Sequence, residues 1–594
     1  MTTPAEFDFI MIKPTHYDDD GYPIVWWRTA LPSNSLASLN GLGRDAAQRQ
    51  VLGPDVKINL IPIDECNTHI VPKKIARDAR KRGARVLIGL VGVQSNQFYH
   101  ALDLAKEFRA EGLPVVIGGF HVSGCISMLK EIPAEIQEAM DIGCALFAGE
   151  AEEGRLDEVL IDAWNGTLKP MYNHMNDLPN LAGAPTPWLP AEAIKTSSPW
   201  SSFDLGRGCP FQCSFCTIIN VQGRKSRFRS PEDLELMIRE NYAQGIKAYF
   251  VTDDNLARNK DWEAFFDTLI RLREEEGMAV HLTIQVDTMC HRIPGFIDKA
   301  AKAGAWRVFL GLENINPDNL IAANKRQNKI TEYRHMMQMW HERGCFLIAG
   351  YILGFPGDTK ESILRDVEIV KRELPIDMLE FFFLTPLPGS EDHRKMLYSG
   401  QWMDPDLNKY DLHHRVSHHG TMSDAEWEEA YQMAWDAYFT LDHMETVAKR
   451  HARRANGSPR RSLQYMNEFR MLYRNEKVHV LEGGVIRRKR RLSRRPGMKI
   501  ENPLLFYPKY WFESARKILN YLHGYREEKK LLRKVLEAPD RYDYMDLAIS
   551  PPAEDELESL GLFQQTRGGA EAVVRETRVR RPKEMEAETE TVAA

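Results

Sequence analysis

Residues 206–216 read GRGCPFQCSFC and place three cysteines, Cys209, Cys213 and Cys216, within eight positions. The segment follows a short apolar run, so we expect it on a loop directly after a β-strand. Three thiolates on one loop can bind three irons of a cubane and leave the fourth iron open. The spacing therefore predicts a 4Fe–4S cluster held by these cysteines.

The triplet could instead be a structural zinc site, or it could arise by chance. Zinc normally takes four ligands in paired C-x₂₋₄-C spacings, and no fourth Cys or His lies nearby in the sequence. With eight cysteines in 594 residues, chance gives on the order of 10⁻³ such triplets. The cluster accounts for the pattern better. Its open iron suits S-adenosylmethionine (SAM), whose amino and carboxylate groups can chelate iron.

Around the cysteines, apolar runs alternate with helical patterns. We expect parallel strands at residues 202–205, 248–252, 281–286, 307–312, 346–353 and 378–384. Helical stretches such as 231–244 and 261–276 join them. Six β/α units over residues 200–395 predict an open, partial (β/α)6 barrel rather than a closed eight-stranded one. In either fold the chemistry belongs at the C-terminal ends of the strands.

An earlier α/β series occupies residues 1–165. Buried parallel strands are expected at residues 7–13, 56–63, 85–91, 114–118 and 144–148. Helical patterns at residues 73–81 and 99–111 lie between them. This order predicts a doubly wound, Rossmann-like domain whose ligands lie beyond the C-terminal strand ends. Residues 166–199 contain many prolines and are expected to be a linker.

The rest of the chain is expected to be mainly helical over residues 396–565, with a charged, disordered tail at 566–594. Residues 487–495 hold seven basic residues out of nine, and an aromatic amphipathic stretch follows at 506–522. Such a pair can contact an anionic membrane surface, which would favour a lipid or a hydrophobic macrocycle as substrate. A solvated charge run or a subunit contact is the alternative.

Composition limits the class of protein. At 594 residues the chain is long enough for three or four domains, and its net charge of -6 gives no support for nucleic-acid binding. No apolar run reaches the roughly 18–20 residues that span a bilayer. The N-terminus lacks the basic region and cleavage site of a secretory signal. Eight cysteines are too few for a disulfide framework. We therefore expect a cytoplasmic protein.

The cysteine motif, with Phe215 before the last cysteine and a β/α series after it, resembles the radical SAM superfamily. Matched position by position, the resemblance implies that Asp253 and Asp254, in TDDN at residues 252–255, contact the amino group of SAM. Glu313, in GLE at 311–313, would contact the ribose. Gly350 and Gly354 would lie on the adenine side.

Two departures from the family pattern weaken this assignment. Gly357 stands where the fifth-strand motif often has Glu, and Asp253-Asp254 replaces the commoner Gly-Gly-Glu. Each motif could also have a purely structural role. Asp253 and Asp254 could cap the following helix, and Gly354 and Gly357 could be turn glycines.

The N-terminal domain resembles the cobalamin-binding domain that precedes the barrel in one large radical SAM subgroup. The resemblance rests on LPSNSLASL at 31–39, VVIGGFH at 115–121 and FAGEAEEG at 147–154. It implies that Gly118, Gly119 and Gly149 let the backbone approach a corrin, which a Cβ would obstruct. His121 would lie near the corrin, or be a hydrogen-bonded structural histidine.

A cobalt-binding D-x-H-x-x-G motif is absent from the first-strand loop, where His16 has the wrong spacing. If cobalamin binds, we expect no protein histidine on its lower face. In methylthiotransferases, three cysteines of a comparable α/β domain hold a second cluster. Here Cys66 and Cys125 lie past the C-terminal ends of strands, whereas Cys144 lies at the start of one. We expect these three cysteines not to converge and to act as small buried residues.

The resemblance implies a cobalamin-dependent radical SAM methyltransferase with a 4Fe–4S cluster, SAM and cobalamin as cofactors. Reductive cleavage of SAM would start the radical reaction, and cobalamin would carry the methyl group. The same subgroup includes the anaerobic magnesium-protoporphyrin monomethyl ester cyclase, and nothing in the sequence separates the two. A cobalamin-binding sensor with an inactive barrel is a third hypothesis, against which the intact cysteine triplet argues. We expect a small-molecule or lipid-like substrate and a low-potential electron donor such as a flavodoxin or ferredoxin.

Overall fold

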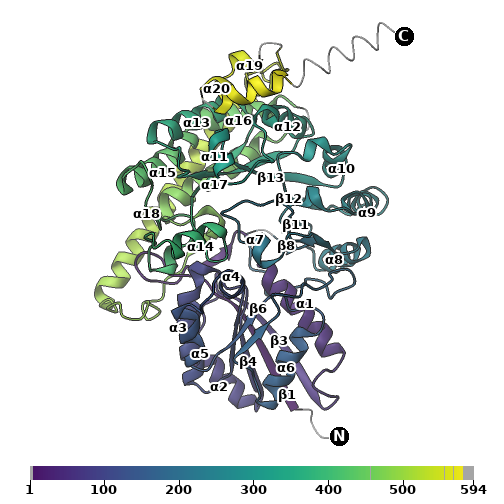
Figure 1. Ribbon diagram of the computed structural model, residues 1–594, viewed down its shortest axis with the longest axis vertical. Helices are drawn as coiled ribbons and strands as arrows, with labels where there is room; N and C mark the ends of the chain where they lie inside the picture. The colour runs from purple at the N-terminus through teal and green to yellow at the C-terminus, as the bar shows by residue number, and fades with distance from the viewer. Residues whose placement is uncertain (1–4, 198, 455–456, 554–555, 566–567, 579–594) are drawn as a thin grey trace. The chain divides into compact units, whose positions relative to one another are not determined.

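The computed structural model describes residues 5–197, 199–454, 457–553, 556–565 and 568–578 (Figure 1). The chain divides into two compact units, each assembled from three segments. The first unit comprises Met1–Ile284, Thr385–Ser417 and Leu472–Tyr521, and the second comprises Gln285–Leu384, His418–Met471 and Leu522–Ala594. The predicted cluster loop and the predicted Rossmann-like domain therefore belong to the same unit.

A six-stranded parallel sheet forms the N-terminal part of the first unit, in the order β3-β1-β4-β5-β6-β7. Its strands are β1 (Ala5–Lys13), β3 (Val56–Asp64), β4 (Arg85–Leu90), β5 (Val115–Gly118), β6 (Ala145–Ala148) and β7 (Met171–Asn173). The chain leaves β1 toward one edge and then returns past it toward the other. The five predicted strands and the doubly wound fold are confirmed.

The sixth strand, β7, comes from the proline-rich segment that the sequence predicts to be a linker. Leu146 of β6 pairs with Met171, and the Leu146 N–H donates to the Pro170 carbonyl at 2.9 Å. Proline is tolerated there because β7 is an edge strand and Pro170 only accepts. The segment thus extends the sheet, a role that its composition conceals.

Helices cover both faces of this sheet (Figure 1). They are α2 (Pro72–Arg82), α3 (Phe98–Ala110) and α5 (Ala134–Asp141) on one face, and α1 (Asn34–Gln48) and α6 (Arg155–Asn165) on the other. Successive side chains of β1 alternate between these layers. Ile10 and Ile12 pack with α3, whereas Phe9 and Met11 pack with α1 and α6. Burial on both faces explains the continuous apolar runs in the sequence.

All six strands of the predicted barrel are present. In the first unit β11 (Ala248–Val251) lies parallel between β8 (Trp200–Phe203) and β12 (His281–Val286), and the division between the units falls inside β12. In the second unit β14 (Phe346–Leu353) lies parallel between β13 (Ala305–Glu313) and β15 (Met378–Phe383).

The connecting helices begin at recognisable caps. Before α8 (Pro231–Ala243), the Ser230 hydroxyl accepts from the Asp233 N–H while the Asp233 carboxylate accepts from the Ser230 N–H. Pro231 occupies the first helical position, where it needs no N–H partner. The other connections include α9 (Trp262–Glu274), α10 (Phe296–Lys302), α12 (Ile330–Glu342) and α13 (Lys360–Glu373). These helices confirm the β/α alternation.

The C-terminal region is mainly helical, as predicted, with α15 (Asp424–Tyr438), α17 (Pro459–Glu476) and α18 (Pro503–Leu536) as its longer members. The start of the basic run instead lies in β16 (Gly484–Arg487), antiparallel to β2 (Trp26–Thr29). Residues 568–578 are helical, where disorder was expected, and 566–567 and 579–594 lie outside the described residues. No helix in the described part of the chain is long and apolar enough to cross a membrane.

Candidate active site

The cysteine loop lies between two short antiparallel strands, β9 (Gly206–Arg207) and β10 (Arg227–Phe228). Gly208 has a φ of +89°, and a Cβ there would lie within 3.1 Å of three carbonyl oxygens, those of Gln222, Gly223 and Lys225. Only glycine fits such a close approach of backbone to backbone. The glycine before Cys209 is therefore required by the turn that presents the cysteines.

Hydrogen bonds fix the backbone of this loop. The Cys209 N–H donates to the Gly223 carbonyl and the Cys216 N–H to the Cys213 carbonyl, each at 3.2 Å. Ser214 accepts through its carbonyl from the Asp392 N–H at 3.2 Å, and its hydroxyl donates to the Asp392 carboxylate at 3.1 Å. Asp392 lies in the first turn of α14 (Glu391–Tyr398). These four hydrogen bonds thus fix the backbone of the loop.

The three cysteines form no disulfide; Cys213 is buried, and Cys209 and Cys216 are half-buried. Burial, with a smaller contribution from Cys213, raises the pKa of the Cys216 thiol to about 12. Among the described residues, no group of His, Cys, Asp and Glu close enough to hold one metal ion includes these cysteines. Three thiolates on one loop suit a cubane, in which each thiolate binds a different iron.

Asp253 and Asp254 both bind the backbone beside the cysteine loop. The Leu205 N–H donates to Asp253 Oδ1 at 2.6 Å, and the Gly208 N–H donates to Asp254 Oδ2 at 3.0 Å. Burial raises the pKa of Asp253 to about 8 and that of Asp254 to about 7. Neither residue caps a helix, since Asp261 occupies the cap of α9. Their contact with the amino group of SAM stays a prediction.

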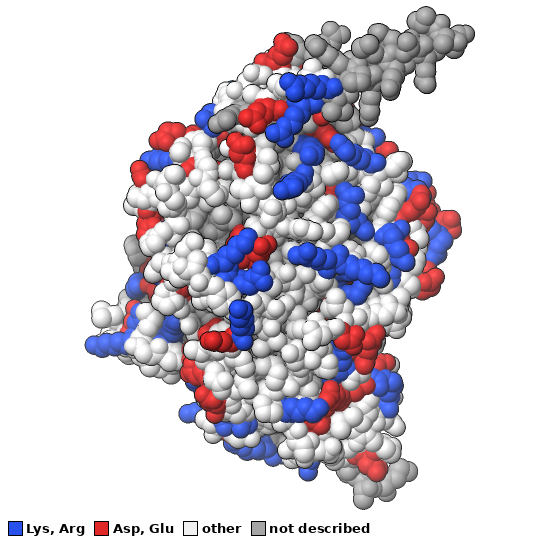
Figure 2. Space-filling view, viewed as in Figure 1, with Lys and Arg blue, Asp and Glu red and all other residues white. Residues whose placement is uncertain are grey.

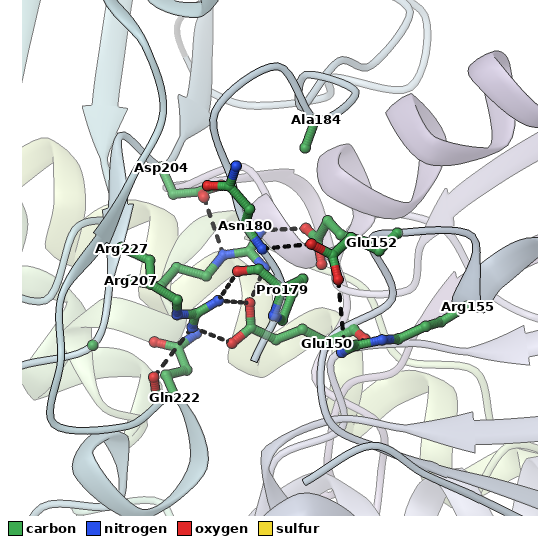
Figure 3. Close-up of polar contacts among 12 residues, drawn as sticks. Glu150, Glu152, Arg155, Pro179, Asn180, Ala184, Asp204, Arg207, Gln222 and Arg227 are labelled. Atoms are coloured by element: carbon green, nitrogen blue, oxygen red, sulfur yellow. Dashed lines mark hydrogen bonds and ion pairs between the residues drawn. The ribbon is translucent and has the colours of Figure 1, made fainter. Parts of the chain in front are cut away.

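The strands β9 and β10 and the cysteine loop between them, residues 206–228, form the cysteine hairpin. An ion-pair network connects this hairpin to the segment after β6 (Figure 3). The Arg207 guanidinium lies 2.7 Å from carboxylate oxygens of both Glu150 and Glu152 and 3.0 Å from Asp204. Arg227 donates to the same Glu150 carboxylate at 3.0 Å. Arg207 outweighs the effect of burial and lowers the pKa of Glu152. Both segments stand out in the sequence as separate motifs, but nothing there signals their pairing.

A cavity of about 190 Å³ lies between the sheet and helices α1 and α6. Its wall is mainly apolar and includes Phe9, Leu42, Leu87, Val116 and Phe147, together with the predicted residues Gly118, Gly119 and Gly149. Arg207 and Gln222, from the cysteine hairpin, complete its lining. The cavity therefore reaches from the core of the Rossmann-like sheet to the predicted cluster loop.

The three glycines are required by packing within the fold as well as lining the cavity. Gly119 has a φ of +149°, and a Cβ there would lie 2.1 Å from the Val93 nitrogen. At Gly149, with a φ of +111°, a Cβ would lie 3.1 Å from His174, and at Gly118 it would lie 3.2 Å from Phe147. Their absence of side chains also leaves a smooth wall. The corrin contacts of the three glycines stay predictions.

His121 is fully buried and does not line this cavity. Its Nδ1 lies 3.1 Å from the Ser95 hydroxyl and its Nε2 lies 3.3 Å from Glu135. Burial alone would lower the pKa of His121, but Cys125 and Glu135 outweigh it and raise the pKa to about 9. This geometry is that of a hydrogen-bonded structural histidine, the alternative that the sequence left open.

His16 lines a second cavity, of about 370 Å³, beyond the ends of β1, β3 and β4. Its Nε2 lies 2.7 Å from the Glu482 carboxylate. Neither His16 nor His121 is among the residues that line the glycine-walled cavity. The prediction concerning the lower face of cobalt remains a prediction.

Cys66, Cys125 and Cys144 occupy different surroundings. Cys66 accepts from the Lys13 ammonium at 2.9 Å, Cys125 lies 4.0 Å from the His121 ring, and Cys144 packs in the core beside α3 and α5. No group of potential metal ligands in the described residues contains more than one of them. The geometry gives no support to a second cluster.

The remaining predicted site residues belong to the second unit. Glu313 has a φ of +61°, at a register shift of the β13–β14 ladder, and its carboxylate pairs with Lys325. Such bulges and left-handed residues are common near active sites, because they redirect a side chain. The backbone at Glu313 is therefore consistent with a ligand contact, and its contact with the ribose stays a prediction.

Packing accounts for the glycines of the fifth-strand motif. Gly354 has a φ of +105°, and a Cβ there would lie 2.0 Å from the Trp427 ring. Its N–H donates to the Asp358 carboxylate at 2.9 Å. At Gly350 a Cβ would lie 3.1 Å from the Phe309 ring. A role as a turn glycine therefore suffices for Gly354, and contact with adenine stays a prediction for both.

Two curated relatives align with 55% and 32% of this chain. The bacteriochlorophyllide d C-8(2)-methyltransferase of Chlorobaculum tepidum is 28% identical over 348 residues, which cover 55% of this chain and 72% of the relative. The anaerobic magnesium-protoporphyrin IX monomethyl ester cyclase of Rubrivivax gelatinosus is 25% identical over 193 residues, which cover 32% of this chain and 33% of the relative. Methyltransferases and a cyclase are thus both among its relatives.

The fold resembles that of the cobalamin-dependent S-adenosylmethionine radical enzyme OxsB, with a TM-score of 0.51 and 14% identity over 97% of this chain and 83% of that one. At this identity the likeness concerns the fold. Residues 204–370 match the Radical SAM superfamily, and this stretch begins five residues before Cys209. Together with the cysteine loop and the β/α series, the match identifies this part of the chain as a radical SAM domain.

Proposed function

We propose that this protein is a cobalamin-dependent radical SAM methyltransferase that methylates an unactivated carbon of a small-molecule or lipid-like substrate. The observation that carries the proposal is the apolar, glycine-walled cavity whose lining includes Arg207 and Gln222 of the cysteine hairpin. One unit thus joins an apolar, glycine-walled cavity to a loop suited to a cluster. The methyltransferase relatives and the OxsB-like fold support the same assignment.

In this proposal Cys209, Cys213 and Cys216 hold the cluster with SAM, and the glycine-walled cavity holds cobalamin. When bound, these groups supply a carbon radical and a methyl donor, while the protein positions them and excludes water. Asp253 and Asp254 fix the backbone at Leu205 and Gly208.

The Arg207 network fixes the wall of the cavity against the cysteine hairpin. Its carboxylates, Glu150 and Glu152, follow the strand that carries the cavity wall. A fixed spacing between cluster and cavity is what a reaction between two bound cofactors requires. A cytoplasmic location and a flavodoxin or ferredoxin as electron donor belong to the same proposal.

The test is anaerobic reconstitution of the full-length protein with iron, sulfide and hydroxocobalamin, followed by SAM with a labelled methyl group and a reductant. We expect 5′-deoxyadenosine and transfer of the label to the bound cobalamin. Absence of 5′-deoxyadenosine from protein with a full complement of iron and sulfide would contradict the radical SAM assignment.

The cyclase is the second candidate, favoured by the alignment with the Rubrivivax gelatinosus enzyme. It predicts 5′-deoxyadenosine with bound cobalamin that never acquires the label. A cobalamin-binding sensor with an inactive barrel predicts bound cobalamin without any cleavage of SAM. The same experiment therefore separates all three hypotheses.

A further inference from the structure

The outward face of α18 is apolar. In the part of this helix that belongs to the first unit, six large side chains are between 54% and 81% exposed: Leu504, Leu505, Trp511, Phe512, Ile518 and Leu519. They recur at intervals of seven residues, two turns of helix, and therefore form one continuous face. An apolar surface of this kind on a soluble fold marks a binding surface.

The opposite face of α18 anchors the helix to the first unit. Phe506 is 3% exposed, and its ring centroid lies 5.5 Å from that of Tyr22. The Tyr510 hydroxyl donates to the Arg487 carbonyl at 3.1 Å, and Lys517 pairs with Glu476. Because the helix already has a packed face, its apolar outer face is left for an occupant outside the described chain.

The surroundings of this face are strongly basic. Residues 484–521 hold eleven Lys or Arg against two Glu, although the whole chain has a net charge of -6 and both signs are spread over the face shown in Figure 2. Part of this charge serves the fold, since Arg487 and Lys489 pair with Asp18, and Arg495 pairs with Asp406. The basic run is therefore only partly available to an external partner.

Four exposed cations remain, with no ion pair to any described residue: Arg490, Lys499, Lys509 and Arg516. Lys509 and Arg516 lie one turn after Leu505 and Phe512, at the border of the apolar face. A helix with an apolar face, an aromatic residue such as Trp511 and a cationic border matches the interface of an anionic lipid bilayer.

We propose that the outer face of α18 attaches the protein peripherally to a membrane surface that contains anionic lipids. The helix lies in the plane of the headgroups, its apolar side chains reach the acyl region and its border cations contact lipid phosphates. A second copy of the chain fits this face less well. A two-fold contact would bring Lys509 and Arg516 of one copy close to the same two cations of the other copy, and like charges repel. The inference is independent of the proposed chemistry.

The test is co-sedimentation of the full-length protein with sucrose-loaded vesicles of phosphatidylcholine alone or mixed with phosphatidylglycerol. We expect binding to the mixed vesicles that falls as salt is added. Neutralising two cations, in Lys509→Gln/Arg516→Gln, should weaken binding by about 30-fold. Leu505→Gln/Phe512→Gln should remove it, because the apolar face no longer inserts.

Matched changes elsewhere on the surface provide the controls. Leu236→Gln alters an exposed leucine on α8, and Lys74→Gln alters an exposed lysine on α2. Both should leave vesicle binding unchanged, and circular dichroism should be the same for all variants. Failure of the folded wild type to bind mixed vesicles would overturn the proposal. So would a concentration-dependent dimer that the Leu505→Gln/Phe512→Gln variant abolishes.

Discussion

The cysteine loop at residues 206–216 and the basic run at 487–495 are both unusual in composition, yet the fold treats them differently. In the basic run, Arg487 and Lys489 pair with Asp18, and Arg495 pairs with Asp406. Three charges of the run are thus paired within the first unit. In the cysteine loop, the fold braces the backbone and leaves the thiols without a disulfide.

The difference shows how a local cluster of one residue type should be interpreted. Opposite charges elsewhere in the chain can neutralise a basic run, so it can serve stability. For the cysteine loop the effect of the fold is the opposite: burial raises the pKa of the Cys216 thiol and so disfavours its thiolate. A bound metal cluster would offset this effect, because it binds thiolates and displaces their protons.

The largest effect is expected for Cys213→Ala, which should abolish SAM cleavage to the background of the assay while the protein stays folded. Its matched control is Cys345→Ala, since Cys345 is also buried but donates only to the Ala305 carbonyl. Iron content, the visible spectrum of the reconstituted protein and 5′-deoxyadenosine formation are the measurements. Retained cleavage of SAM would contradict the cluster assignment, because the cysteine loop would then be structural, like the basic run.

A smaller effect is expected for Arg207→Gln, which removes the cation that pairs with the buried carboxylates of Glu150 and Glu152. Breaking one side of a buried ion pair costs roughly 3–5 kcal/mol of unfolding free energy. Arg239→Gln is the control, because its pairs with Glu235 and Glu276 are exposed and cost at most about 1 kcal/mol. Urea denaturation measures both. Equal losses would show that the network at the cavity is no stronger than a surface pair.

The effect of burial on an ionisable group can be measured at Glu380, which lies in β15 and is the ladder partner of Gly350 in β14. It is 1% exposed, its Oε2 has no hydrogen-bond partner among the described residues, and burial, opposed by Arg307, raises the pKa of its carboxyl to about 8. The folded state then binds a proton that the unfolded state releases, so stability is greatest at low pH and declines as the pH rises.

For the wild type we expect a loss of roughly 3 kcal/mol between about pH 5 and pH 7 that Glu380→Gln does not show. The measurement is the difference in urea midpoint between the two proteins at each pH, without cluster or cobalamin. Parallel pH profiles would mean that burial does not shift this carboxyl, and would weaken the same argument for the thiol of Cys216.

The smallest effect is expected within the basic run. Arg495 pairs with Asp406 through two hydrogen bonds of 2.7 and 2.9 Å, and both side chains are more than a quarter exposed. A double-mutant cycle with Arg495→Ala and Asp406→Ala should give a coupling energy of about 0.5–1 kcal/mol. A coupling well above this range would place the run among the main stabilising elements of the first unit.

Sequence patterns predicted all the long strands because parallel strands buried on both faces are continuous apolar runs, as in β1 and β14. They failed for β7 and for the pair of β2 and β16, which are short edge strands. Their pairing depends on backbone groups that another segment supplies, such as the hydrogen bond from Leu146 to Pro170. Composition carries no signal for such a partner.

By itself the sequence determined the cysteine triplet, the two β/α series and the glycines that their turns require, because each depends on residues close together in the chain. Only the tertiary structure decided that Arg207 pairs with Glu150 and Glu152, that Asp253 and Asp254 brace the cysteine loop, and that His121 does not line the cavity. It also decided which cations of the basic run form ion pairs within the fold. Ion pairs and hydrogen bonds act over a few ångströms in space, and their partners here lie tens to hundreds of residues apart in sequence.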